Sequence, residues 1–181
     1  MKKILVFISV LLLISACKTT EEAKSSRIEL RNDKKITNQA KVKEAVESKR
    51  YIIKLDKVYF ARGGIVDLLP RKNYIIIDGT KAIISAAYLG RQYDSRPIAG
   101  INMHGITDYY KLTNNPSKGL YEIKMKVNNG NDSFDVYLRI GKNGSCNASI
   151  SSLKIDNIRY RGYIVPIPDK QNNNFQEGEL I

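Results

Sequence analysis

Alternation between apolar and polar side chains, with a period of two residues, dominates the second half of the sequence. In residues 120–127 every second side chain is apolar, and residues 132–140 repeat the pattern. A β-strand that is buried on one face has this period, because successive side chains point to opposite faces of the sheet. The segment NNGND between the two runs is typical of a hairpin loop. This part of the chain is therefore expected to form antiparallel strands.

Other short segments have the composition of strands and are separated by turn sequences. Asp78-Gly79 and Asn143-Gly144 are hairpin signals with strand-like residues on both sides. Short strands linked by hairpins favour an antiparallel meander that curls into a sandwich or a partly open barrel. Besides the two runs above, the expected strands cover residues 51–60, 64–69, 73–78, 81–88, 100–105, 108–114, 146–153 and 157–165.

One segment ahead of the strands has helical spacing. In residues 37–50, the apolar residues Val42, Ala45 and Val46 recur at helical intervals, and strong helix formers fill most other positions. The apolar stripe is narrow, so this helix is expected to lie against the sheet. The expected fold class is α+β, mainly β, with a short N-terminal helix followed by a curved antiparallel meander sheet.

The N-terminus indicates export. Lys2 and Lys3 precede an apolar run that is shorter than the roughly 20 residues a membrane-spanning helix needs, so residues 1–16 are expected to be a signal peptide. The small residues directly before Cys17 resemble a bacterial lipobox, which implies cleavage before Cys17 and attachment of lipid to its sulfur. The mature protein is then expected to be tethered to a membrane of the cell envelope.

The rest of the chain divides by composition. Residues 17–36 are polar and poor in large apolar side chains, which predicts a flexible tether after the lipidated cysteine. Residues 37–165 are expected to form a single domain. Residues 166–181 contain two prolines and three consecutive asparagines, and they are expected to be a disordered tail.

The chain is basic, with a formal net charge of +12 at pH 7. Loss of Lys2 and Lys3 with the signal peptide lowers this value by two, to +10, since residues 1–17 contain no acid. A basic balance favours nucleic acid or a membrane surface as partner, and the export signal argues against nucleic acid. Three interpretations remain: an anionic lipid surface, an anionic glycan, or a charge that serves solubility alone.

The sequence offers no catalytic constellation. His104 is the only histidine, so no pair of histidines can bind zinc, and neither a metal site nor a cofactor is predicted. Once Cys17 is lipidated, Cys146 has no cysteine to pair with, and it is expected to be a small buried hydrophobe. A nucleophilic pair of Cys146 with His104 is the less favoured reading. We therefore expect a non-enzymatic binding or structural protein, with an enzyme acting on envelope polymers as the alternative.

The segment AYLGRQYDSRP (87–97) is the first candidate binding site. Arg91 and Arg96 can hold a carboxylate, phosphate or sulfate, and Tyr88 and Tyr93 can stack on a sugar. The structural alternative is that Gly90 makes a bend, the tyrosine rings are buried and the arginines lie over them. Binding residues concentrate on loops, which keeps the first interpretation open.

The last expected strand supplies a second candidate. Arg159, Arg161 and Tyr163 alternate with apolar residues, so they share one face of the sheet. Tyr137 and Arg139 lie on the polar face of their own strand. If the two strands are neighbours, these side chains share one face, which is either a surface for an anionic or glycan-like ligand or a solvated basic face. A second binding hypothesis places an apolar ligand inside the curved sheet.

Four segments carry a resemblance to a known family: YLGRQY (88–93), LYEIKMKVNNGNDSFDVYLRI (120–140), KNGSCNASIS (142–151) and RYRGYI (159–164). The order of lipobox, polar linker, helix and strands resembles a family of lipoproteins from Bacteroides-type bacteria, domain-of-unknown-function family 4251, over about residues 40–165. The resemblance implies the cell envelope, with the outer membrane as the location, and supplies no activity. Family members have Pro-Tyr-Phe-Gly-Arg-Ala-Tyr near residues 86–93, where this chain lacks the proline and the phenylalanine, which argues against a fixed catalytic element.

Overall fold

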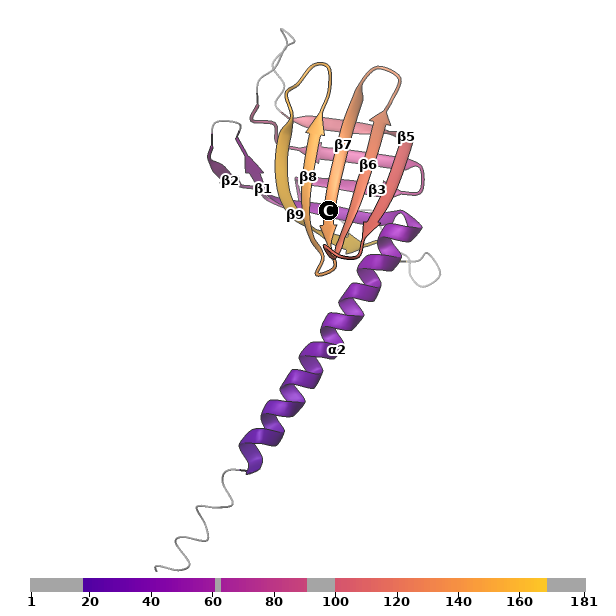
Figure 1. Ribbon diagram of the computed structural model, residues 1–181. Helices are drawn as coiled ribbons and strands as arrows, with labels where there is room; N and C mark the ends of the chain where they lie inside the picture. The colour runs from indigo at the N-terminus through magenta and orange to yellow at the C-terminus, as the bar shows by residue number, and fades with distance from the viewer. Residues whose placement is uncertain (1–17, 61–62, 91–99, 169–181) are drawn as a thin grey trace, which may run out of the picture. The chain divides into compact units, whose positions relative to one another are not determined.

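The structure is a computed structural model that describes residues 18–60, 63–90 and 100–168 (Figure 1). The chain divides into two units, Met1–Thr37 and Asn38–Ile181. The described residues form one helix, α2 (Lys18–Ser48), followed by nine strands. The strands are β1 (Arg50–Tyr59), β2 (Ile65–Asp67), β3 (Tyr74–Asp78), β4 (Lys81–Ala86), β5 (Ile101–Asn115), β6 (Leu120–Asn128), β7 (Ser133–Gly141), β8 (Ser145–Ser151) and β9 (Ile158–Pro166).

Helix α2 is longer than the sequence analysis predicts, because it begins at Lys18 instead of Thr37. The segment that was expected to be a flexible tether is thus helical from residue 18 on. It contains neither glycine nor proline and is rich in strong helix formers, which explains the extension. Lys49 has a φ of 55°, and this left-handed conformation ends the helix before β1. Within the part of the chain that the structure describes, no helix is long and apolar enough to cross a membrane.

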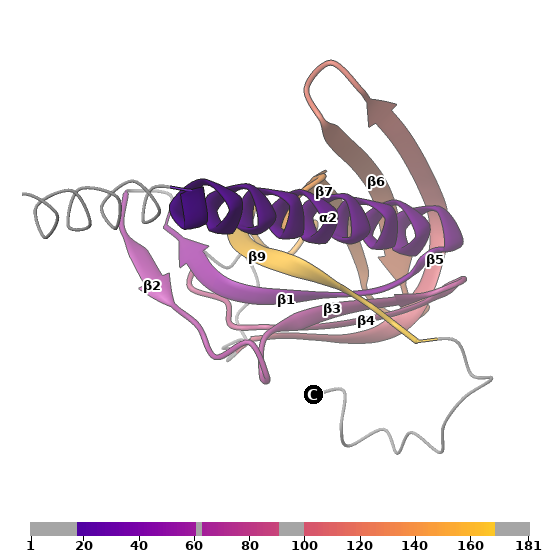
Figure 2. The same cartoon turned by 90° about the horizontal axis from the view of Figure 1, so that it is seen from below.

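The sheet closes into an eight-stranded antiparallel barrel. Strands β3 to β8 each pair with the next strand along the chain, and β9 pairs back with β1, which also pairs with β3. The short strand β2 pairs with the far end of β1 and lies outside the closed circuit (Figure 2). The mainly β fold and the antiparallel meander are confirmed, and closure is complete where the sequence analysis predicts a sandwich or a partly open barrel.

Two corners allow the strands to cross each other steeply, as Figure 1 shows for β1 and β3 behind β6 to β8. At one corner β5 continues through residues that the sequence analysis divides into two strands, with a register shift between Thr107 and Tyr109. A Cβ atom at Gly105 would lie 2.2 Å from the carbonyl oxygen of Asn128. At the other corner β1 has a register shift after Leu55, opposite Gly162. Glycine and bulges together allow such bends.

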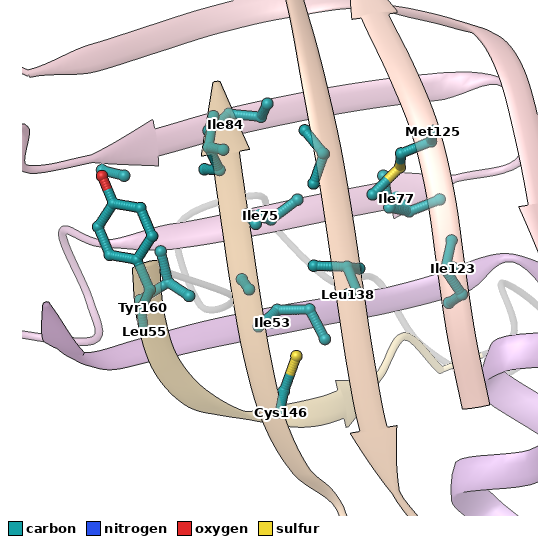
Figure 3. Packing of buried hydrophobic residues seen from close by; sticks show 14 of the residues in the cluster. Ile53, Leu55, Ile75, Ile77, Ile84, Ile123, Met125, Leu138, Cys146 and Tyr160 are labelled. Atoms are coloured by element: carbon teal, nitrogen blue, oxygen red, sulfur yellow. The ribbon is translucent and has the colours of Figure 1, made fainter. Parts of the chain in front are cut away.

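One hydrophobic cluster occupies the interior of the barrel (Figure 3). All of its members lie between Val42 and Ile164, so the barrel and the last turns of α2 contain the whole cluster. The alternating residues of β6 point inward as predicted, and Val42, Ala45 and Val46 of α2 are buried in the same cluster. The largest fully buried members are Tyr51, Ile53, Leu55, Ile75, Ile77, Ile84, Met103, Ile123, Leu138, Ile140 and Tyr160.

Candidate anion-binding face

Strands β7, β8 and β9 place arginines from distant parts of the sequence on one outer surface of the barrel. The register pairs Arg161 of β9 with Asn147 of β8, and Asn147 with Arg139 of β7. Neighbouring strands are spaced by about 4.8 Å, so the backbones of the two arginines are about 10 Å apart. We call this surface the basic face, and it consists of Tyr137, Arg139, Asn147, Ser149, Arg159, Arg161 and Tyr163.

A second row runs beside the first. Arg159 pairs with Ser149, and Ser149 pairs with Tyr137. The hydroxyl of Ser149 donates a hydrogen bond to the side-chain oxygen of Asn157. In both rows a short polar side chain of β8 separates two longer side chains. The sequence analysis expected a common face only if β7 and β9 were neighbours, whereas the structure shows β8 between them.

One acidic residue, Glu122, neutralises part of the basic face. A carboxylate oxygen of Glu122 lies 3.7 Å from Nε of Arg139. Burial raises the pKa of Tyr137, and the adjacent Glu122 carboxylate raises it further. In contrast, within the described residues no acid lies at ion-pair distance from Arg159 or Arg161, and both side chains are exposed. The β9 side of the face is therefore the more positive one.

The first candidate segment is described only in part. Arg91, Tyr93 and Arg96 lie outside the described residues. The side chain of Tyr88 is only 6% exposed and belongs to the interior cluster, and the backbone of Asp156 forms a hydrogen bond with it. A Cβ atom at Gly90 would lie 2.6 Å from the hydroxyl oxygen of Tyr88, so this ring lies over the glycine. Tyr88 thus occupies a buried position rather than an open surface.

The backbone of Ala87, the residue before Tyr88, is held by two side chains that the sequence analysis did not single out as a pair. The amide oxygen of Asn73 accepts a hydrogen bond of 2.7 Å from the backbone N–H of Ala87. The hydroxyl of Tyr160 donates a hydrogen bond of 2.9 Å to the carbonyl oxygen of the same residue. Asn73 is only 7% exposed, and its amide nitrogen donates to the carbonyl oxygen of Leu69. A single asparagine before a strand carries no sequence signal for this role.

The model of a protein family described as domain of unknown function DUF4251 matches residues 33–164. The chain belongs to this family. A crystal structure of a DUF4251 family protein from Bacteroides eggerthii DSM 20697 is similar to it, with a TM-score of 0.61 and 12% sequence identity. The similarity covers 72% of this chain and 88% of the other, and at this identity it shows a common fold. No match was found among the curated proteins.

Cys146 and His104 lie on opposite faces of the DUF4251 barrel. The sulfur of Cys146 points into the interior, as Figure 3 shows, and its side chain is fully buried, as the sequence analysis expected. His104 is exposed on the outer face of β5. The two side chains therefore do not form a nucleophile and base. Burial raises the pKa of the Cys146 thiol, so the thiol stays protonated and unreactive at neutral pH.

A cleft of about 480 Å³ lies where the last turns of α2 meet the end of β9. Its polar groups are the side chains of Lys41, Glu44, Ser48 and Arg50. Arg50 already donates a hydrogen bond of 3.0 Å to the carbonyl oxygen of Pro168, and its Nε lies 3.3 Å from the carboxylate of Asp78. Among the described residues, no three His, Cys, Asp or Glu side chains gather as potential metal ligands.

Proposed function

We propose that this protein is a lipid-anchored, non-enzymatic module of the bacterial cell envelope that binds an acidic glycan on its basic face. The observation that carries the proposal is the adjacency of the two rows on β7 to β9, with Arg159 and Arg161 unneutralised by any described acid. Guanidinium groups bind carboxylates and sulfates through paired hydrogen bonds. A polymer with recurring negative charges can contact both rows at once.

The aromatic residues of the basic face favour a glycan over a simple anion. Tyr163 is 42% exposed and lies on the same face as Arg161, two residues away along β9. The ring of Tyr137 has Lys124 Nζ at 5.8 Å from its centre, at the opposite edge of the face. An exposed ring such as that of Tyr163 presents apolar surface to the flat side of a sugar while its hydroxyl remains in water.

The interior of the barrel supports the outer surface as the binding site. Large side chains from every strand of the closed circuit meet in one cluster, including the rings of Tyr51 and Tyr160. An apolar ligand would have to share this volume with them. The alternative of an apolar ligand inside the sheet thus finds less support in the described residues than binding at the basic face.

Binding can be tested with residues 18–181, which retain the whole interior cluster but lack the apolar leader and Cys17. Titration calorimetry at low salt would compare polygalacturonate with neutral dextran. We expect binding of the acidic polymer alone, and roughly a tenfold or greater loss of affinity in Arg159→Ala/Arg161→Ala.

The matched control is Lys34→Ala/Lys35→Ala, which removes the same two charges from exposed positions of α2. It should bind the acidic polymer like the wild type. Equal losses in the two variants would mean that net charge alone attracts the polymer, and equal binding of dextran would exclude recognition of the acidic groups.

The lipid anchor belongs to the same proposal and has its own test. Two acyl chains hold a protein stably on a bilayer, because each buried CH₂ contributes about 0.8 kcal/mol. In the native host, the full-length protein should fractionate with membranes, and Cys17→Ser should appear in the soluble fraction. A variant that stays with the membranes would contradict lipidation at this residue.

A further inference from the structure

Exposed aliphatic side chains gather at one end of the barrel. Nine large hydrophobic side chains are exposed in the described residues. Two of them belong to β2, one to the loop that follows β2, and two to other loops nearby. We call this set the aliphatic end, and it consists of Ile65, Val66, Leu69, Leu89 and Leu153. Leu153 is 100% exposed. Single exposed apolar residues are common on proteins, but a set that shares one end of a barrel needs an explanation.

Hydrogen bonds show that the three loops lie together. The side chain of Asn73 connects two of these loops. Its amide nitrogen donates a hydrogen bond of 3.0 Å to the carbonyl oxygen of Leu69, and its oxygen accepts one of 2.7 Å from the backbone N–H of Ala87. Tyr88, which follows Ala87, hydrogen-bonds with the backbone of Asp156 in the loop that carries Leu153. The side chains of Leu69, Leu89 and Leu153 are therefore attached to a connected rim.

Strand β2 adds the two remaining side chains to the same end. It pairs with the end of β1 through Val58 and Val66, and the same part of β1 pairs with Tyr160 near the start of β9. Figure 1 shows β2 and β9 on the same side of the barrel. All three residues of β2 are exposed, so this strand contributes little to the core.

Positive charges accompany the aliphatic side chains. Arg71 and Lys72 follow Leu69 within three residues and are exposed, and no described acid lies at ion-pair distance from either. Lys154, next to Leu153, is paired with Asp132. The acid within β2, Asp67, is paired with Lys57. The unneutralised side chains beside Leu69 are thus cationic.

This combination fits an anionic lipid bilayer better than a protein surface. Energetically dominant residues of protein interfaces are enriched in Trp, Tyr and Arg, whereas Leu and Val are under-represented there. Aliphatic side chains that enter the interfacial layer, with Lys and Arg at the level of the headgroups, are typical of proteins that lie on membranes. We propose that the aliphatic end docks on an anionic lipid bilayer surface, with Leu69, Leu89 and Leu153 entering the interfacial layer.

The test uses residues 18–181 without a lipid anchor and sedimentation with vesicles. Vesicles of phosphatidylcholine with one quarter phosphatidylglycerol would be compared with pure phosphatidylcholine. We expect the wild type to bind the anionic vesicles more tightly than the neutral ones, and Leu69→Ser/Leu153→Ser to bind them at least about tenfold more weakly. Ile106→Ser/Tyr109→Ser removes two exposed apolar side chains from β5, away from the aliphatic end, and should leave binding unchanged.

Several outcomes would overturn the proposal. The wild type could fail to sediment with either vesicle, or the β5 control could lose as much binding as the leucine variant. If Arg159→Ala/Arg161→Ala abolished vesicle binding while the leucine variant retained it, the basic face would be the lipid site instead. If the wild type were a dimer by light scattering and the leucine variant a monomer, the occupant would be a second copy. Circular dichroism would first establish that each variant is folded.

Discussion

The hydroxyl of Tyr160, in the last strand, donates a hydrogen bond of 2.9 Å to the backbone carbonyl of Ala87, which lies 73 positions earlier in the chain. Asn73 binds the N–H of the same residue. Both polar groups of the Ala87 backbone are thereby satisfied by side chains. The contact joins β9 to the segment after β4, although β1 and β3 lie between these two strands in the closed circuit. It fixes the backbone where the Arg- and Tyr-rich segment begins.

Replacing Tyr160 with phenylalanine should destabilise the protein. Tyr160→Phe keeps the ring in the core but leaves the carbonyl oxygen of Ala87 without this donor, so we expect the free energy of unfolding to fall by about 1–2 kcal/mol. Urea denaturation would measure the change. Tyr163→Phe removes a hydroxyl from an exposed ring of the same strand and should cost much less. Equal costs would contradict a stabilising role for the Tyr160 bond.

Replacing Asn73 should also destabilise the protein, because its buried side-chain oxygen is the acceptor for the backbone N–H of Ala87. Asn73→Ala leaves the N–H of Ala87 without this acceptor, whereas the carbonyl oxygen of Leu69 keeps its backbone donors, so we expect the free energy of unfolding to fall by about 1–3 kcal/mol. Asn129 is the matched control, since its side chain also makes two hydrogen bonds to the backbone but lies in an exposed turn. Asn129→Ala should lose less than half as much, since water can replace its bonds.

Gly162 is expected to tolerate no side chain. A Cβ atom at this position would lie 2.0 Å from the carbonyl oxygen of Lys54, which belongs to the paired backbone of β1. Gly162→Ala should therefore lower the free energy of unfolding by about 3 kcal/mol or more. The comparison is Gly130→Ala, which has open space around it and bears only the strain of its φ of 89°. Thermal denaturation of both variants would rank them, and a similar loss in both would argue against a steric limit at the corner.

Cys146 should make stability depend on pH in the alkaline range. Burial raises the pKa of its thiol in the folded protein, whereas the unfolded thiol ionises near its ordinary value of about 8.5. Above that pH the folded state binds more protons than the unfolded state, so the stabilisation is complete below pH 8.5 and falls as the pH rises, by up to about 1.4 kcal/mol per pH unit.

The variant Cys146→Ala isolates this contribution. Urea denaturation between pH 7.5 and 9.5 should show a clearly smaller decline for the variant than for the wild type. The upper limit stays below pH 10, where the buried Tyr51 and Tyr160, whose pKa values burial also raises, would add to the decline. Parallel curves for the two proteins would mean that the thiol ionises alike in both states.

Glu122 should weaken binding at the basic face, because it competes for Arg139. Glu122→Gln removes the charge that lies 3.7 Å from the guanidinium, so we expect affinity for polygalacturonate to rise by a factor of about two to five. Asp135→Asn is the control, since it also removes one acid from the outer face but frees Lys126, which lies outside the basic face. A larger gain from Asp135→Asn would locate the glycan on β6 instead.

The strands were predictable because each carries its own signal. A buried face repeats every second residue, and the Gly-containing turns at Gly79 and Gly144 have the positive φ that their sequences require. The helix was predicted from its narrow apolar stripe, but its first half lacks such a stripe. That half is helical through local propensity, which the composition of a polar segment does not separate from a flexible linker.

The candidate site was predictable only as separate strands. Arg159 and Arg161 were recognised as sharing one face because alternation is local to a strand. Their distance from Arg139 depends on which strand lies between β7 and β9, and hairpin order alone leaves sheet closure open. Asn73 gave no signal, because its distant partner Ala87 is brought to it by the register of β3 against β4.

By itself, the sequence determined the strand segments, the inward-facing set of apolar side chains and the family, because these depend on periodicity and on local motifs. The tertiary structure decided that β9 returns to β1, that Gly105 and Gly162 become corners, and that exposed leucines of three separate loops share one rim. These features arise from contacts between residues far apart in the chain. Their energies depend on how backbones meet in space, which no local pattern of residues encodes.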